Sequence, residues 1–226
     1  MVAATPPPTL VRHLQHDEQQ LRVATGARFV HIARDRQRIV RALGMQPALA
    51  ARVIALRRVE RDDLTARRDL VRLGAASPAQ IGGVSTGPAL PLTTLVRAYR
   101  AARRRFGIRW QLLAAINFVE SDFGRARTTR RADAQGPMQF EPATWRRYGM
   151  GGDVNDPHDA IMAAANLLAA NGGRTDERRA LGHYNLAPLY WDAVLRLAHR
   201  ITVNRTALRE YYAWRLYLRP GGKSTP

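Results

Sequence analysis

The sequence predicts an all-α protein, and three observations support this fold class. Apolar residues recur at spacings of three and four along most segments, which is the period of one helix face. Residues that begin or end helices separate these segments, such as Pro47, Gly107 and the run Asp156-Pro157-His158-Asp159. No segment shows the regular alternation of apolar and polar residues that is typical of a strand. We therefore expect helices throughout the 226 residues.

The first part of the chain, residues 1–77, is predicted to form a helical hairpin that serves as an accessory segment. Three prolines within residues 3–9 indicate an extended arm. An apolar helical pattern then covers residues 10–43, and Gly44 ends it. A second helix begins at Pro47. Two helices joined by a short turn predict an antiparallel pair.

Residues 78–91 are predicted to be a linker, because Gly, Pro, Ser and Ala dominate them and GGVSTGP stands at their centre. We expect a domain boundary here, with a helical domain over residues 92–201. Its predicted helices cover residues 92–106, the segment that ends at Glu120, residues 142–148, the segment from Asp156 to Asn171, and residues 178–184 and 189–201.

The last segment, residues 202–226, is unusually aromatic for a terminus, with Tyr211, Tyr212, Trp214 and Tyr217. We expect this tail to pack back on the helical domain. The alternative is an exposed aromatic patch that binds glycan.

Composition limits the classes of function. The formal net charge is +18, and a basic chain is attracted to polyanions such as nucleic acid, anionic lipid or an acidic cell wall. The charge is spread along the chain, no zinc-ligand spacing is present, and Arg103-Arg104-Arg105 lie on one predicted helix, so we expect no nucleic-acid partner. The absence of cysteine excludes disulfides and thiolate catalysis. His13, His16 and His31 are expected at the surface, and no metal site is expected.

Glu120 is the candidate catalytic residue. The helical spacing places it on one stripe with Leu113, Ile116 and Asn117, where a core residue is expected. Partial burial and the negative end of the helix dipole both raise the pKa of a carboxyl group, and a protonated carboxyl group near neutral pH can act as a general acid. The alternative is a structural ion pair with an arginine, which would lower this pKa; the candidates are Arg125, Arg127, Arg130 and Arg131.

Three motifs follow in order: Glu120-Ser121 after a helix, Gly136-Pro137-Met138-Gln139, and His183-Tyr184-Asn185. Together they resemble the signatures Glu-Ser, Gly-Leu-Met-Gln and Ala-Tyr-Asn of the lytic murein transglycosylases, across about half of the chain. The resemblance implies a lysozyme-like helical domain preceded by the N-terminal hairpin.

The resemblance also implies the site. Glu120 would be the single general acid and base. Met138 and Phe140 would contact a sugar face, and Gly136 belongs to the same loop. Ser121, Gln139 and Asn185 would supply polar contacts, and the Tyr184 phenol would lie near the acid. Asn185 would either fix a turn of the chain or bind the substrate.

Three residues depart from the family pattern. Pro137 replaces a leucine and removes one backbone donor from the loop. His183 replaces a small residue, and we expect it to point away from the site. Glu141 stands where an apolar residue is common, either at the surface or as a substrate contact.

The number of acids bears on mechanism. Most glycosidases use two carboxyl groups, whereas the motifs supply only Glu120. Two nearby aspartates are not expected to act as the second acid: Asp122 should point away from Glu120 on a helix, and Asp133 lies in the arginine-rich loop. The resemblance therefore implies a peptidoglycan lytic transglycosylase that needs no cofactor and makes 1,6-anhydro ends. The alternatives are a lysozyme-type hydrolase and a non-catalytic basic protein that binds the wall or nucleic acid.

The location of the substrate sets the expected compartment. The resemblance implies peptidoglycan glycan strands as the partner, and hence action outside the cytoplasm. The opening residues have neither a basic start nor an apolar middle, so no secretory signal is visible in this chain. No run is long and apolar enough to predict a transmembrane segment.

Overall fold

The computed structural model describes residues 5–76, 86–126, 133–215, 217–219 and 223–225. In chain order the elements are α1 (Pro7–Val23), α2 (Gly26–Gly44), α3 (Pro47–Leu56), η2 (Arg58–Glu60), α4 (Arg61–Ala76), α5 (Leu92–Phe106), α6 (Trp110–Ser121), α7 (Pro142–Tyr148), α8 (Pro157–Ala170), α9 (Glu177–Tyr184), α10 (Pro188–Val203), α11 (Ala207–Ala213), β1 (Tyr217–Arg219) and β2 (Lys223–Thr225). None of these helices combines the length and apolar character that crossing a membrane requires.

The all-α fold class is confirmed, with two differences in detail. The predicted N-terminal hairpin is a set of four α-helices, because both predicted helices are interrupted. The first is interrupted at Ala24 and Thr25, which are extended, and at Gly26, whose φ is +53°. Glycine adopts this left-handed conformation without a steric penalty. The second is interrupted at Arg57, which is not helical, and continues through η2 into α4. Near the C-terminus, β1 and β2 pair antiparallel, with Tyr217 opposite Thr225. This short hairpin was not expected from the sequence.

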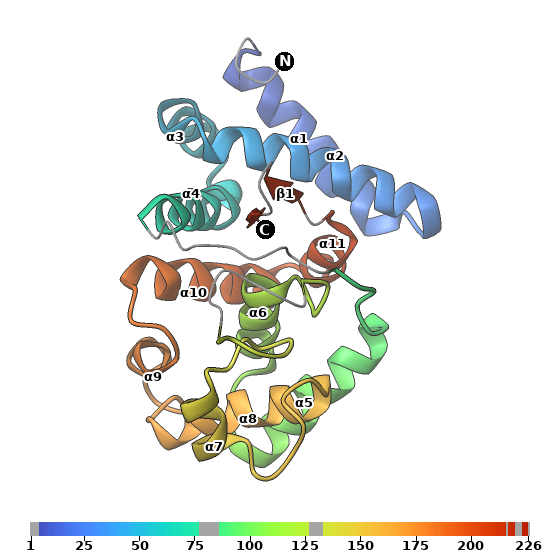
Figure 1. Cartoon of the computed structure of the whole chain (residues 1–226). Helices are drawn as coiled ribbons and strands as arrows, with labels where there is room; N and C mark the ends of the chain where they lie inside the picture. Colours follow the sequence, from blue (N-terminus) through green and yellow to red (C-terminus); the bar gives the residue numbers. More distant parts are fainter. Residues whose placement is uncertain (1–4, 77–85, 127–132, 216, 220–222, 226) are drawn as a thin grey trace.

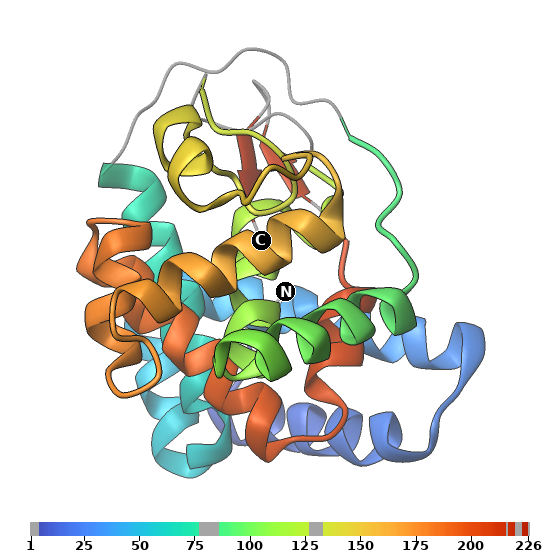
Figure 2. The same ribbon diagram turned by 90° about the horizontal axis from the view of Figure 1, so that it is seen from below.

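Helices α10 and α6 lie between two groups of helices (Figure 1). Helices α1–α4 lie on one side, and α10 packs along α4. Helices α5, α7, α8 and α9 lie on the other side, where α5 and α8 lie side by side (Figure 2). The elements that follow the predicted linker thus rest on the elements that precede it.

One buried hydrophobic core contains residues from both parts of the chain. Leu14, Val40 and Leu64 of the N-terminal helices belong to it together with Leu113 and Val194. The predicted boundary at 78–91 falls largely on residues 77–85, which lie outside the described residues, so the boundary stays a prediction. Tyr211 and Trp214 are also buried in this core, as expected for a tail that packs back on the helices.

A buried group of charged residues, the Arg36 cluster, joins the N-terminal helices to α10 and α11. Its members are Arg36, Glu60, Asp63, Arg200 and Glu210. The Arg36 guanidinium lies 2.6 Å from Glu60 Oε2, 2.7 Å from Asp63 Oδ2 and 2.7 Å from Glu210 Oε1. The side chains of Arg36, Glu60 and Asp63 are fully buried.

The protonation of this cluster depends on burial as well as on the ion pairs. Burial raises the pKa of Glu210 to about 7, against the opposing effect of the Arg36 charge. The pKa of Asp63 is lowered, because the charges of Arg200 and Arg36 outweigh its burial. Buried ion pairs of this kind add little net stability compared with apolar packing, but removing one partner leaves an uncompensated charge.

We predict that Arg36→Met lowers the free energy of unfolding by about 3–5 kcal/mol, because three buried carboxyl groups lose their shared cation. The loss should be smaller at pH 5 than at pH 8, since the pKa of Glu210 is raised to about 7 and its protonation at pH 5 removes one of the negative charges that Arg36 balances. Chemical denaturation at both pH values measures this. Arg38→Met is the control, since Arg38 lies on the same helix with an exposed side chain. Equal stability losses for the two variants would contradict a dependence on the cluster.

Candidate active site at the end of helix α6

Helix α6 carries Glu120 out of the core. Its residues from Leu112 to Phe118 are all buried, so the helix runs through the protein interior and only its ends approach the surface. The left-handed conformations of Asp122 and Phe123, with φ of +51° and +61°, end the helix directly after Ser121. Glu120 therefore lies in the last turn, and its side chain is half-buried.

Tyr190 holds Glu120. Its hydroxyl group donates a hydrogen bond of 2.6 Å to Glu120 Oε1 from the first turn of α10. Burial, followed by the negative charge of Glu120, raises the pKa of Tyr190 well above its usual value. The phenol thus stays protonated and remains a donor. Sequence reasoning missed Tyr190, for which the only signal was an aromatic residue at a helix start shortly after Tyr184-Asn185.

The loop Gln135–Phe140 is a tight hairpin next to this helix end. The backbone groups of Gln135 and Phe140 exchange two hydrogen bonds of 2.9 Å. Gly136 has a φ of +72°, and a Cβ atom here would lie 1.8 Å from the carbonyl oxygen of Val154. Only glycine fits at this close approach of two chain segments. Gln139 also has a positive φ, and its side-chain amide donates to the Gly136 carbonyl at 2.8 Å.

The carbonyl oxygen of Pro137 attaches this loop to α6. It accepts hydrogen bonds from Asn117 Nδ2 at 2.8 Å and from Ser121 Oγ at 2.5 Å. Asn117 Oδ1 in turn accepts from the buried hydroxyl group of Tyr99 at 2.6 Å. Pro137 lacks a backbone N–H, but the loop is held through its carbonyl group, so the departure from leucine leaves this contact intact. We call Tyr99, Asn117, Ser121 and Pro137 the loop clamp.

Tyr184 and Asn185 close the site from the end of α9. The Tyr184 hydroxyl group donates to the Met138 carbonyl at 2.5 Å, and its ring stacks on Tyr190 with 6.4 Å between centroids. Burial, followed by the negative charge of Glu120, raises the pKa of Tyr184 well above its usual value. Asn185 Oδ1 accepts from the Ala187 amide at 3.0 Å, which fixes the turn into α10.

The predicted site residues thus surround the Glu120 turn, but they differ in exposure. Gln139, Tyr184 and Asn185 are half-buried. The others are buried: Ser121, Gly136, Met138 and Phe140. The buried side chains lie within the protein interior, whereas the half-buried ones keep part of their surface exposed. His183 and Glu141 are exposed.

Asp122 is the carboxyl group nearest to Glu120 in sequence, and the structure places it inside the protein. It is 4% exposed, and its Oδ1 lies 3.3 Å from Arg125 Nη1. Burial raises the pKa of Asp122 to about 7, which the charge of Arg125 opposes. Arg125, one of the four predicted partners of Glu120, contacts Asp122 and donates to the Tyr212 carbonyl at 2.8 Å. The remaining candidates, at positions 127, 130 and 131, lie outside the described residues.

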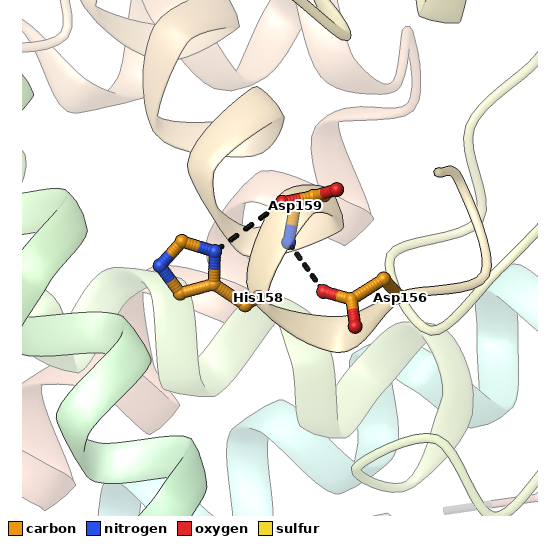
Figure 3. Close-up of side chains that lie close together, drawn as sticks. All are labelled: Asp156, His158 and Asp159. Carbon is orange, nitrogen blue, oxygen red and sulfur yellow. Dashed lines mark hydrogen bonds and ion pairs between the residues drawn. The ribbon is translucent and has the colours of Figure 1, made fainter. Parts of the chain in front are cut away.

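One group of side chains within the described ranges could offer three ligand atoms to a metal. Asp156, His158 and Asp159 stand at the start of α8, with these atoms within 4.8 Å of one another (Figure 3). Each aspartate already has a structural role. Asp156 Oδ1 caps α8 by accepting from the Asp159 amide at 2.9 Å, and Asp159 Oδ2 accepts from the Asp153 amide at 3.1 Å. We assign this group to the helix start rather than to a metal.

The part of the chain that carries these residues matches a family model. Residues 97–194 match the family described as Transglycosylase SLT domain. Neither a curated protein nor a solved structure matches the chain. The matched range begins within α5 and ends within α10, so it contains Glu120, the loop clamp and Tyr190. Over residues 97–194 the chain is therefore similar to a transglycosylase SLT domain, in line with its all-α fold.

Proposed function

We propose that this protein is a peptidoglycan lytic transglycosylase with Glu120 as its single general acid and base. The observation that carries the proposal is the half-buried Glu120 at the end of α6, oriented by the Tyr190 hydroxyl group within the SLT domain. A catalytic acid must be held in a defined direction and must also reach the substrate. Glu120 meets both conditions.

The reaction requires two proton transfers. Glu120 first protonates the oxygen of the β-1,4 bond between N-acetylmuramic acid and N-acetylglucosamine, and that bond breaks. The carboxylate then removes the proton from the 6-hydroxyl group of the muramic acid as its oxygen bonds to the anomeric carbon. This step closes the 1,6-anhydro ring and returns the proton to Glu120. Proton transfer and positioning account for the whole reaction, so we propose no cofactor.

The supporting residues divide into two groups. Gln139, Tyr184 and Asn185 are half-buried, and we assign them to substrate contact. We assign the buried residues a supporting role, in which they give the site its shape: Ser121, Gly136, Met138 and Phe140. Tyr190 is a positioning residue, because its hydroxyl group acts through Glu120.

The burial of Asp122 favours a reaction with one acid. A retaining or inverting glycosidase needs a second carboxyl group that faces the sugar or a water molecule. Asp122 is 4% exposed and contacts Arg125, so it is not available for this role in the described conformation. Lysozyme-type hydrolysis is the alternative outcome. Because peptidoglycan lies outside the cytoplasm, we also propose that the protein acts there.

We predict that Glu120→Gln lowers the rate of glycan cleavage at least 100-fold, because glutamine cannot transfer the proton. The thermal midpoint should change little, since the amide still accepts a hydrogen bond from Tyr190. Turbidity of a peptidoglycan suspension measures cleavage. Asp133→Asn is the control, because it removes an exposed carboxylate from the same part of the chain. Unchanged activity in the Glu120 variant would exclude this assignment.

We also predict that Tyr190→Phe lowers kcat about tenfold and changes KM little, since the lost hydrogen bond orients the acid rather than the sugar. Tyr212→Phe is the matched control, because it removes a hydrogen bond of 2.9 Å to the Leu90 carbonyl. A rise in KM with constant kcat would instead assign Tyr190 to substrate binding.

The products separate the two reaction types. A lytic transglycosylase leaves anhydro-muramyl ends, which are lighter than reducing ends by one water molecule. We expect mass spectrometry of a peptidoglycan digest to show anhydro ends. A digest that contains only reducing ends would assign the protein to the hydrolases, with water in place of the 6-hydroxyl group.

A further inference from the structure

A pocket lies between α5 and the start of α8. Its volume is about 570 Å³, within the size range of pockets that hold small organic ligands. Leu90 and side chains of α5 between Thr94 and Arg104 form one side, and residues 156–158 form the other. It shares no lining residue with the Glu120 site, and the role proposed for Glu120 does not involve it.

Three arginines line this pocket from one face of α5. Arg97, Arg100 and Arg104 are spaced by three and four residues, which brings them together on the helix surface. Neither Arg100 nor Arg104 has a hydrogen bond or an ion pair with any described residue, and Arg97 donates only to Thr94 Oγ1, at 3.3 Å. Like charges at these spacings destabilise a helix by a few tenths of a kcal/mol per pair. A bound anion would offset this repulsion.

The remaining charges of the pocket do not balance the arginines. Figure 3 shows His158 and Asp156 on different sides of the helix start, with Asp156 directed to the Asp159 amide. His158 Nδ1 lies 3.3 Å from Asp159 Oδ1. Three permanently charged guanidinium groups therefore face one carboxylate, which already caps α8.

The pocket also has an apolar floor, which distinguishes it from a simple basic patch. Leu90, Leu95, Ala98, Ala101 and Pro157 line it together with the arginines. A small inorganic anion makes no use of such a surface. An organic anion with aliphatic segments gains from burying them there as well as from the charge pairs.

We propose that this pocket binds the carboxylate-bearing stem peptides of peptidoglycan. This inference rests on the proposed function, because that function supplies a substrate whose glycan strands carry short acidic peptides. Aliphatic side chains and several carboxylates in one ligand match the apolar floor and the three arginines. The pocket would hold the peptide while Glu120 acts on the glycan, so that strands with acidic peptides are preferred over bare glycan.

The test uses the full chain and a free acidic stem tripeptide of alanine, glutamate and diaminopimelate, which contains no glycosidic bond. Isothermal titration calorimetry should detect its binding to the wild-type protein. The double variant Arg100→Gln/Arg104→Gln should weaken binding at least about tenfold, since each charge-assisted contact contributes roughly 1.5–3 kcal/mol and 1.4 kcal/mol is tenfold. The control Arg103→Gln/Arg105→Gln removes the same charge from the same helix outside the pocket lining, and should stay within about twofold of the wild type.

A tripeptide with amidated carboxyl groups should bind at least about tenfold more weakly than the acid. Absence of binding, equal loss in the two double variants, or equal binding of acid and amide would each overturn the proposal. Stronger binding of inorganic phosphate or of a short oligonucleotide would overturn it as well, in favour of a phosphate site. Cleavage of peptide-free glycan strands tests Glu120 independently, so failure of the pocket and failure of the proposed function are distinguishable.

Discussion

The geometry of the candidate site depends on the carbonyl oxygen of Pro137. This one atom accepts from both Asn117 and Ser121, and it thereby fixes the Gln135–Phe140 loop against the last turn of α6. Losing one donor would leave the oxygen with the other, whereas losing both would leave a buried carbonyl group unsatisfied, which costs about 1–3 kcal/mol. Tyr99 extends the same contact to α5 by donating to Asn117. The acid, the loop and α5 are therefore positioned by a single set of buried hydrogen bonds.

The N-terminal helices also act on the site, although they are far from it in sequence. Helix α10 carries Tyr190, which orients Glu120, and α10 packs along α4. The Arg36 cluster fixes the same helix through Arg200 and links it to α11 through Glu210. The position of the Tyr190 hydroxyl group thus depends on contacts with residues that precede the matched SLT range.

The sequence was sufficient for the fold class, for most helix boundaries and for the motifs around Glu120, because these depend on local signals. Pro157 and Gly107 begin and end helices through backbone geometry that any reader of the sequence can recognise. Tyr190 and Asn117 could not be assigned, since a tyrosine or an asparagine on a helix acquires its role only from a partner distant in the chain. The Arg36 cluster could not be predicted for the same reason, because its arginines and acids look like ordinary surface residues in the sequence. The break at Gly26, which divides the first predicted helix, was also missed. The apolar period continues across this glycine and was the stronger signal in the sequence.

The long sequence separation within the Arg36 cluster has a consequence for the order of folding. Arg36 and Glu210 are 174 positions apart, and their contact forms only when α11 exists. Contacts of such separation are late and slow, because the entropy of closing the loop opposes them. During synthesis the Arg36 guanidinium therefore stays hydrated, and the N-terminal helices cannot reach their final packing until α11 has left the ribosome.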